Sequence, residues 1–346
     1  MTPDLSVVLP AYNEAAEIGR TVDALVEAIR RSGLAAEVIL VDDGSTDETV
    51  AVAEQRAAGR LPLRVLRQRN SGRLEARRAG LEAAGAELAL LLDARVTLAP
   101  DALGFVADRL AEGEDVWTGH VDVAADRNPF ALFWKLLAEL AWEEYFADPR
   151  TTHFDAASFD RYPKGAGCFV APRRLLLEAF AAFRSYYAEQ RFSNDDTPVL
   201  RWIAERHGIG VSPHFSAMYV PRTRMLTFLR HSFRRGTVFL DGHGRRESRF
   251  FWPAVAFYPT SALLAAAALR RPVVLPAAVA ALSVGAAAMG VRRRRSATEI
   301  ASLAALAPLY AAAHGAGMWR GLALALREHL REPPLDEVGD IGPRDG

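Results

Sequence analysis

Val38-Ile39-Leu40-Val41-Asp42-Asp43-Gly44-Ser45-Thr46-Asp47 begins as an apolar run and ends in acidic and small polar residues. The apolar run predicts a buried strand, and a helical pattern follows from Glu48 to Ala58. An earlier apolar run, Leu5 to Leu9, closes in the same way in Pro10-Ala11-Tyr12-Asn13-Glu14. In an open α/β sheet, ligands bind beyond the carboxyl ends of the strands. We therefore expect both polar segments to face one ligand-binding crevice.

Asp42 and Asp43 are adjacent like charges, so each needs a hydrogen-bond donor or a cation to face. This requirement favours acids that hydrogen-bond a sugar or a base. The residues that follow, Ser45, Thr46 and Asp47, also suit a simple turn and a helix N-cap. Both interpretations stay open for these three residues.

Short apolar runs alternate with helical patterns, and this alternation predicts an α/β fold with a mostly parallel sheet and crossover helices. The expected strands are Leu5 to Leu9, Val38 to Val41, Leu63 to Leu66, Leu88 to Leu92 and Val116 to Val123. The expected helices are Ala15 to Arg31, Glu48 to Ala58, Leu74 to Ala84, Pro100 to Leu110 and Pro129 to Phe146. The polar stretch from Ala147 to Pro163 is too long for an ordinary connection, so we expect a lid or binding loop, with a disordered surface loop as the alternative.

The composition limits the classes of partner. A chain of 346 residues holds about two domains. Lys plus Arg and Asp plus Glu number 42 each, so the charge balance does not indicate a nucleic-acid partner. Cys168 is the single cysteine, which excludes an internal disulfide, and we expect it to be a buried, unreactive thiol. Met1 to Asp4 lead into a strand without a basic or apolar segment, so we expect no signal peptide.

The last third of the chain holds three apolar stretches, each close to the roughly 20 residues that cross a bilayer. They are Phe251 to Leu269, Val273 to Val291 and Ile300 to Trp319. Arg270-Arg271 follows the first stretch and Arg292 to Arg295 follow the second, which favours membrane helices over buried helices of a soluble protein. The positive-inside rule places Arg292 to Arg295 and the amino-terminal domain on the cytoplasmic side of the cytoplasmic membrane. The third stretch contains Pro308 and His314, and it spans, re-enters or packs inside the bundle. We expect a membrane domain of two or three helices over 251–326 and a polar tail over 327–346.

Four blocks in the first part of the chain together resemble glycosyltransferase family 2. They are Pro10 to Glu14, Val41 to Asp47, the set Asn70-Ser71-Gly72 with Ala76-Arg77 and Gly80, and Leu90 to Asp93. The resemblance covers roughly Leu5 to Leu240, about two thirds of the chain. It implies a Rossmann-like GT-A domain over 1–240, with a nucleotide-sugar half over about 1–123 and an acceptor half over about 124–240.

The resemblance also implies a donor site. It assigns base and ribose contacts to Tyr12, Glu14, Asp43 and Asp93, places Arg77 near the phosphates, and includes Pro10 and Asp42 in the same donor-binding segments. The family's Asp-x-Asp motif ends in an acid that ligates a divalent cation, Mg²⁺ or Mn²⁺. This chain has Asp93-Ala94-Arg95, and a guanidinium repels the ion that a carboxylate would bind.

Three interpretations of Arg95 stay open. Arg95 replaces the cation by pairing with the diphosphate, because guanidinium forms bidentate contacts with phosphate oxygens. Alternatively, Asp93 with His120 or a water still holds a weakly bound metal. In the third interpretation, Arg95 faces solvent or an ion-pair partner.

Asn194-Asp195-Asp196-Thr197 precedes a helical pattern and resembles the family's acidic acceptor-side motif. The resemblance implies that Asp196 is the general base and that Asp195 orients or binds the acceptor. The alternative for either acid is the N-cap of the helix that follows.

Two further segments carry expected roles. Gly165 and Gly167 resemble the Gly-containing strand of the family's acceptor pocket, where a missing side chain lets a sugar approach the backbone; a bulge or close strand packing is the alternative. His231, Arg234 and Arg235 approximate the family's Gln-x-x-Arg-Trp motif and predict a gate over the diphosphate. A basic patch at a membrane surface is the alternative for these three.

Together, the resemblance and the apolar stretches predict a membrane-bound inverting glycosyltransferase in polysaccharide or envelope biosynthesis. Asp196 would deprotonate a hydroxyl of a lipid-linked glycan acceptor, and Arg95 and Arg234, with or without a metal, would stabilise the diphosphate of a nucleotide-sugar donor. The expected partners are the nucleotide sugar, the lipid-linked or glycan acceptor and membrane lipid, and no nucleic acid. The alternatives are a polyprenyl-phosphate sugar transferase, whose acceptor is a phosphate, and a non-catalytic sugar-nucleotide-binding membrane protein.

Overall fold

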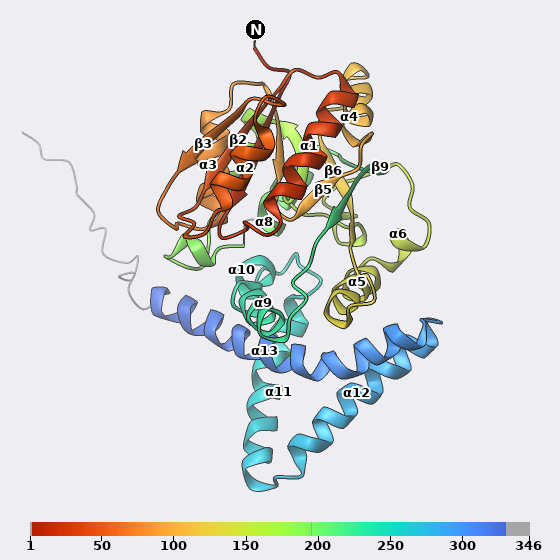
Figure 1. Ribbon diagram of the computed structural model, residues 1–346. Helices are drawn as coiled ribbons and strands as arrows, with labels where there is room; N and C mark the ends of the chain where they lie inside the picture. Colours follow the sequence, from red (N-terminus) through yellow and green to blue (C-terminus); the bar gives the residue numbers. More distant parts are fainter. Residues whose placement is uncertain (1, 195, 330–346) are drawn as a thin grey trace, which may run out of the picture.

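The computed structural model describes residues 2–194 and 196–329, which form an α/β domain standing on a base of helices (Figure 1). Strands β1 to β9 and helices α1 to α4, α7 and α8 belong to the upper domain, and α9 to α13 form the base. Helix α5 lies beside the base, between the two parts.

The first half of the sheet is parallel, as the sequence predicts. Strands β1 (Leu5–Ala11), β2 (Ala36–Asp42), β3 (Leu63–Arg67) and β4 (Leu88–Leu92) lie in the order β3-β2-β1-β4. Helices cover both faces, and this explains why β1 and β4 are buried along their whole length. Val7 and Leu9 of β1 pack with residues of α1 (Ile18–Ser32) and α2 (Thr49–Ala57), whereas Val8 packs with α3 (Arg73–Ala83).

The second half of the sheet mixes strand directions. Strand β8 (Cys168–Pro172) is antiparallel to β4, and β6 (Trp117–Val123) is antiparallel to β8. Strand β9 (Ile209–Tyr219) is parallel to β6, and β5 (Val96–Leu98) is antiparallel to β9. Strands β4, β6 and β9 therefore end at the same edge as β1 and β2. Cys168 is buried in β8, and burial raises the pKa of its thiol, as expected for an unreactive cysteine.

The segment from 147 to 163 packs on the domain, and its role as a lid or binding loop stays a prediction. Its strand β7 (Thr152–Phe154) pairs with β9. The ring of Phe154 stacks on Tyr162 with centroids 5.2 Å apart, and Phe159, in a short 3₁₀ turn (Phe159–Arg161), is fully buried. Buried aromatic side chains hold this segment in place. In the sequence they stand among polar residues, so the pattern does not indicate a packed segment.

The remaining helices of the upper part follow the predicted pattern with one difference. The helix expected from Pro129 to Phe146 is divided into α5 (Pro129–Ala141) and α6 (Glu143–Ala147), because the backbone of Trp142 leaves the helical region at φ −129° and ψ 44°. Asn128 caps α5 by accepting hydrogen bonds from the backbone N–H groups of Phe130 and Ala131. The others are α4 (Ala102–Ala111), α7 (Arg173–Ala182), α8 (Thr197–Ala204) and a 3₁₀ turn (Gln190–Phe192).

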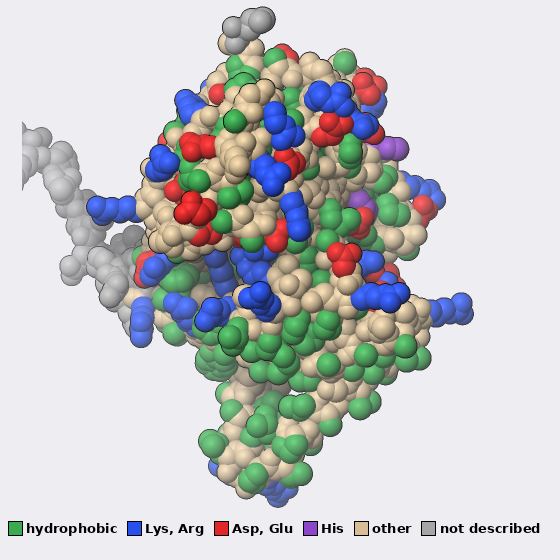
Figure 2. Space-filling model, in the orientation of Figure 1, with side chains coloured by type: hydrophobic (Ala, Val, Ile, Leu, Met, Phe, Trp, Pro, Cys, Tyr) green, Lys and Arg blue, Asp and Glu red, His purple; other side chains and the backbone are tan. Residues whose placement is uncertain are grey.

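The base consists of α9 (Met225–Thr237), α10 (Phe239–His243), α11 (Phe251–Arg270), α12 (Val274–Arg292) and α13 (Ala297–His329). Within the described part of the chain, α11, α12 and α13 are long and apolar enough to cross a membrane. Hydrophobic side chains dominate the visible surface of the base, and Lys and Arg side chains gather where the base meets the α/β domain (Figure 2).

Candidate active site

Two loops at the carboxyl edge of the sheet are tied together by side chains. Asn13 follows β1, donates its backbone N–H to Ser45 Oγ at 3.0 Å, and accepts a bond from the Thr46 backbone N–H at 2.8 Å. Asp47 accepts a bond from the Ala15 N–H at 3.2 Å. Ser45, Thr46 and Asp47 thus stabilise the local backbone, in line with the turn interpretation, and they fix the loop that follows β1.

Both adjacent acids have hydrogen-bond donors. Asp42 accepts a bond from the Ser45 N–H at 2.9 Å. The carboxylate of Asp43 accepts bonds from Gln68 Nε2 at 2.7 Å, from the Ser71 N–H at 2.8 Å and from the Gly72 N–H at 3.0 Å. The last two donors lie at the amino-terminal end of α3, where a carboxylate is favoured. Asp43 therefore anchors the start of α3, and its role toward a donor stays a prediction.

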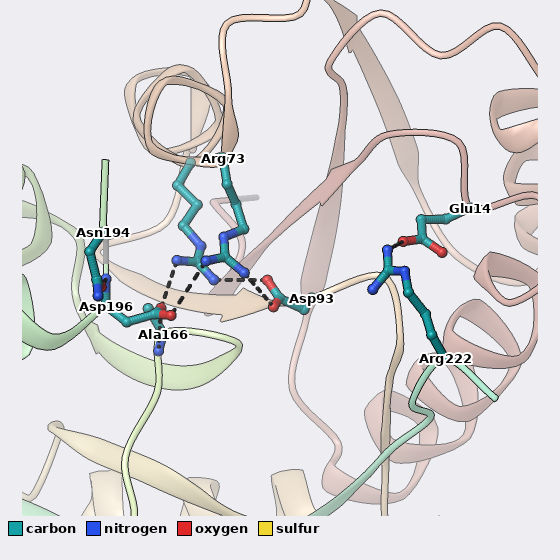
Figure 3. A network of polar contacts seen from close by, with 8 residues as sticks. Glu14, Arg73, Asp93, Ala166, Asn194, Asp196 and Arg222 are labelled. Atoms are coloured by element: carbon teal, nitrogen blue, oxygen red, sulfur yellow. Dashed lines mark hydrogen bonds and ion pairs between the residues drawn. The ribbon is translucent and has the colours of Figure 1, made fainter. Parts of the chain in front are cut away.

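Arg77 of α3 joins the donor and acceptor halves. Its side chain is fully buried and bonds to Asp93 Oδ1 at 2.8 Å and to Asp196 Oδ1 at 3.0 Å. Asp93 follows β4, and Asp196 precedes α8, so residues about 100 positions apart meet at one guanidinium. Arg73, one helical turn before Arg77, lies 3.5 Å from Asp93 and 3.4 Å from Asp196, and Figure 3 shows it between the two acids.

Asp196 is held as a charged carboxylate. Its Oδ1 also accepts a bond from the Ala166 N–H at 3.1 Å. Burial alone would raise the pKa of Asp196, but Arg73 and Arg77 outweigh it and lower that pKa. Asp196 precedes α8 without making a side-chain cap bond, which argues against the N-cap interpretation. Its partner in the predicted motif, Asp195, lies outside the described residues.

A second acid–guanidinium cluster lies on the other side of Asp93 (Figure 3). Glu14 Oε2 pairs with Arg95 Nε at 2.6 Å, and Glu14 Oε1 pairs with Arg222 Nη2 at 3.1 Å. Burial raises the pKa of Glu14, although both guanidiniums oppose that shift. Of the three interpretations of Arg95, the described structure shows the ion-pair partner.

The proposed metal partner His120 lies elsewhere. Its Nδ1 is 3.0 Å from the Tyr145 hydroxyl, and its Nε2 is 3.5 Å from Asp122. Asp93 contacts Arg77 and Arg73 instead. Among residues 2–194 and 196–329, no group of three His, Cys, Asp or Glu side chains is arranged to hold a metal ion.

The glycine segment before β8 lies between the two central acids. A Cβ built at Gly167 would lie 2.8 Å from Asp93 Oδ2, and the Gly167 carbonyl accepts the Asp93 N–H at 2.8 Å. Asp93 packs so closely that a side chain at position 167 would clash with it, which explains why this residue is a glycine. At Gly165, in contrast, no described atom lies within 4 Å of the Cβ position, so this backbone is open to a ligand.

Helix α9 brings the predicted gate residues next to the site. His231 packs its ring edge-on to Trp134, with centroids 5.0 Å apart. Burial lowers the pKa of His231 well below its usual range, and nearby arginines add to the shift: Arg235, Arg222, Arg234 and Arg73. Arg222 pairs with Glu14 and lies three residues before the start of α9, so α9 begins beside the Glu14 cluster. Arg235 itself lies over the Trp134 ring, 5.3 Å from its centroid.

Among the other predicted residues, Pro10 is buried within β1, and Tyr12, directly after β1, is 46% exposed. The sequence interpretation missed Arg73 and Arg222. Arg73 precedes Arg77 by four residues and therefore lies on the same face of the helix. This spacing could have identified Arg73 from the sequence. Arg222 follows β9, and only the place of β9 in the sheet reveals its proximity to Glu14.

Comparisons with known proteins agree with this architecture. Residues 6–169 match the family model described as Glycosyl transferase family 2. An undecaprenyl-phosphate 4-deoxy-4-formamido-L-arabinose transferase of Pseudomonas aeruginosa (strain LESB58) is 34% identical over 183 residues, 52% of this chain and 50% of the relative. The succinoglycan biosynthesis protein ExoO of Rhizobium meliloti (strain 1021) is 35% identical over 124 residues, 36% of this chain and 34% of that protein. The chain thus spans half or less of these relatives' length.

A solved structure, the mannosyltransferase PcManGT from Pyrobaculum calidifontis in complex with GDP-Man and Mn²⁺, has a TM-score of 0.50 and 22% identity. The likeness covers 96% of this chain and 88% of that one, and it shows a shared fold. The shared fold is the GT-A fold that the sequence motifs of this chain imply. The match over residues 6–169, slightly less than half of the chain, shows that the amino-terminal α/β domain is similar to glycosyl transferase family 2.

Proposed function

We propose that this chain is a membrane-bound inverting glycosyltransferase that moves a sugar from a nucleotide sugar to a lipid-linked acceptor in polysaccharide or envelope biosynthesis. One observation carries the proposal: Arg77 holds Asp93 of the donor half beside Asp196 of the acceptor half. The match of residues 6–169 to the family model and the names of the two relatives support the reaction class. The apolar helices of the base support an acceptor carried by lipid.

The site supplies positive charge where a diphosphate would leave. Arg73 and Arg77 contact Asp93, and Arg95 and Arg222 contact Glu14. Fixed charge aimed at a developing anion is typically worth about 3 kcal/mol or more in the transition state. We infer that these guanidiniums, together with Arg234 of α9, stabilise the departing nucleotide diphosphate.

Among the described residues, Asp93 is the acid of the Asp-x-Asp motif that remains as a ligand for a divalent cation. Mg²⁺ is commonly held by one or two carboxylates plus substrate phosphates, and there it would neutralise the diphosphate. Both oxygens of Asp93 already face guanidiniums, however, and Arg95 stands where the second acid would be. This donor set fits a resident cation poorly, and the arginines provide the same charge.

The environment of Asp196 bears on the acceptor group. A hydroxyl acceptor needs a general base, and a carboxylate whose pKa is lowered by two guanidiniums is a weaker one. A lipid phosphate is already ionised at neutral pH and needs no base. Together with the undecaprenyl-phosphate transferase name of the relative, this observation favours a polyprenyl phosphate as acceptor over a glycan hydroxyl.

The test uses the full chain in lipid nanodiscs with a panel of nucleotide sugars and two acceptors, a polyprenyl phosphate and a lipid-linked glycan extract. We expect transfer to the polyprenyl phosphate, and we expect Asp196→Asn to keep that transfer within about tenfold while donor binding is unchanged. If the acceptor is a hydroxyl instead, the same variant should lose about 10² to 10⁴ in rate.

Asp93→Asn is the matched control, because it alters the donor side of the same guanidinium. We expect it to weaken donor binding. Equal loss of donor affinity in both variants would make Asp196 a structural residue. Donor binding without transfer or donor hydrolysis would support the non-catalytic alternative.

A further inference from the structure

We propose that α13 lies in the plane of the membrane surface, so that the described chain crosses the bilayer twice, through α11 and α12. The proposed occupant of the exposed face of α13 is the boundary between lipid headgroups and acyl chains. The inference relies on the membrane attachment in the proposed function, and it concerns how the catalytic domain meets the bilayer.

Helix α13 has a continuous apolar stripe that no described part of the protein covers. Exposed residues recur every three or four positions from Ala301 to Leu326, and they include Ala305, Leu309, Ala312 and Trp319. This spacing places them on one face of the helix. Trp319 is 42% exposed and Leu326 is 52% exposed, beside the exposed Arg320. An apolar face with a tryptophan and flanking arginines fits a membrane interface.

The opposite face of α13 is fixed to α9, backbone against backbone. A Cβ built at Gly236 of α9 would lie 1.9 Å from the His314 carbonyl oxygen, and one at Gly317 would lie 2.1 Å from the Phe233 carbonyl oxygen. Glycine at these contacts allows an approach that any side chain would prevent. Because the two helices are in direct backbone contact, both lie inside the hydrocarbon region of the bilayer or both lie outside it.

Helix α9 is too charged to enter that region. It carries Arg230, Arg234 and Arg235 within its 13 residues. Each arginine costs about 2.5 to 3.5 kcal/mol at the centre of a membrane helix. Arg222, which pairs with Glu14 in the candidate active site, lies three residues before α9, and a location of α9 in the bilayer would remove that part of the site from its soluble donor. Helix α9 thus stays at the surface and keeps α13 there.

The geometry of the base agrees with this placement. Figure 1 shows α11 and α12 descending as a hairpin, while α13 runs across their upper ends beneath the α/β domain. The 33 residues of α13 make a helix about 50 Å long, whereas a bilayer core is about 30 Å thick. Helices α11 and α12, with 20 and 19 residues, match that thickness.

Depth measurements on the full chain in vesicles with anionic lipid test the proposal. Spin labels are attached to cysteines that replace Ala301, Ala312 and Ala323 of α13, in a Cys168→Ala background. We expect equal, shallow depths for all three labels. A crossing helix would separate the first and last labels by about 33 Å of depth, and that result would overturn the proposal. Labels that meet water and no lipid would overturn it as well.

Helix α12 is the internal control. Labels at its exposed residues Leu275, Leu282 and Met289 should give depths that change by about 21 Å along the helix. A flat profile there would refute the membrane hairpin itself and with it the membrane part of the proposed function. A second readout is a reporter at the carboxyl end of the chain. It should lie on the same side as a reporter after Arg294 and opposite to one after Arg271; the reverse would overturn the in-plane placement.

Discussion

A guanidinium buried between two carboxylates fixes the distance between them, and Arg77 has this position between Asp93 and Asp196. The Arg77 side chain is fully buried, and each acid is about one quarter to one third exposed. Truncating such a residue removes the buried counter-charge that the two carboxylates share. The geometry of the whole candidate site therefore depends on this one side chain.

Arg77→Ala should lower the free energy of unfolding by about 3 kcal/mol, because it breaks a buried ion-pair network. Arg73→Ala is the control on the same helix face. Its side chain is 42% exposed and its contacts are 3.4 and 3.5 Å long, so we expect a loss below about 1 kcal/mol. Thermal unfolding of the purified variants measures both. Similar losses in the two variants would contradict the central role of Arg77.

The charge at Arg95 leads to a second prediction. If guanidiniums neutralise the diphosphate, transferase activity should survive a chelator, and Arg95→Ala should reduce it at least about tenfold. Arg95→Asp should make the remaining activity depend on Mg²⁺ or Mn²⁺, because it restores the missing acid. Chelator-sensitive activity together with a near-neutral Arg95→Ala would show that a cation bound through Asp93 does this work.

At the scale of single elements, the packing of α3 against the sheet determines the positions of Arg73 and Arg77. Gly80 is the point of contact. A Cβ built there would lie 2.3 Å from Val8 Cγ1 and 3.1 Å from Val41 Cγ2. The glycine lets α3 approach β1 and β2 closely, and this approach brings Arg77 to the ends of the strands.

Gly80→Ala should destabilise the domain by about 1 to 3 kcal/mol, because the added methyl group overpacks the contact with the sheet. Gly104→Ala in α4 is the matched control. No described atom lies within 4 Å of the Cβ position there, so alanine should stabilise the helix by up to about 1 kcal/mol. Opposite signs in the two unfolding curves are the expected result. Two losses of equal size would mean that the effect is not one of packing.

The sequence predicts those elements whose signal is local. The parallel half of the sheet, α1 to α3 and the three apolar helices follow from periodicity, because each buries or exposes one regular face. The packing of residues 147–163 was not predictable, since its fixed position depends on β7 pairing with β9 and on Phe154 stacking on Tyr162. The pairs of Glu14 with Arg95 and Arg222 likewise depend on strand order, which no local pattern contains.

At the scale of the whole molecule, ion pairs connect the end of the hairpin to the α/β domain. Arg295 pairs with Glu139 of α5 at 2.5 Å, and Arg293 pairs with Glu143 of α6. The cluster Arg292 to Arg295 is thus on the side of the catalytic domain, whereas Arg271 lies at the far end of the hairpin (Figure 1). This arrangement supports the proposed cytoplasmic position of both the domain and the cluster.

A reporter fused after Arg295 should be cytoplasmic, on the same side as a reporter at the amino terminus. The matched control is a fusion after Arg271, which should be extracytoplasmic. Paired fluorescent-protein and alkaline-phosphatase fusions distinguish the two sides. Alkaline-phosphatase activity after Arg295 would invert the proposed topology.

The close contact between α9 and α13 sets the height at which the chemistry takes place. Two packed helices have axes about 8 to 10 Å apart, so α9 can rise above a helix at the bilayer surface by no more than that spacing. Arg222, the partner of Glu14, lies three residues before the start of α9. With α13 in the proposed position at the membrane surface, the Glu14 side of the site would lie close above the headgroups, within reach of a group attached directly to the lipid. An acceptor whose reacting end is several sugar units from its lipid would extend past that part of the site, so the length of the acceptor is itself a criterion for selection.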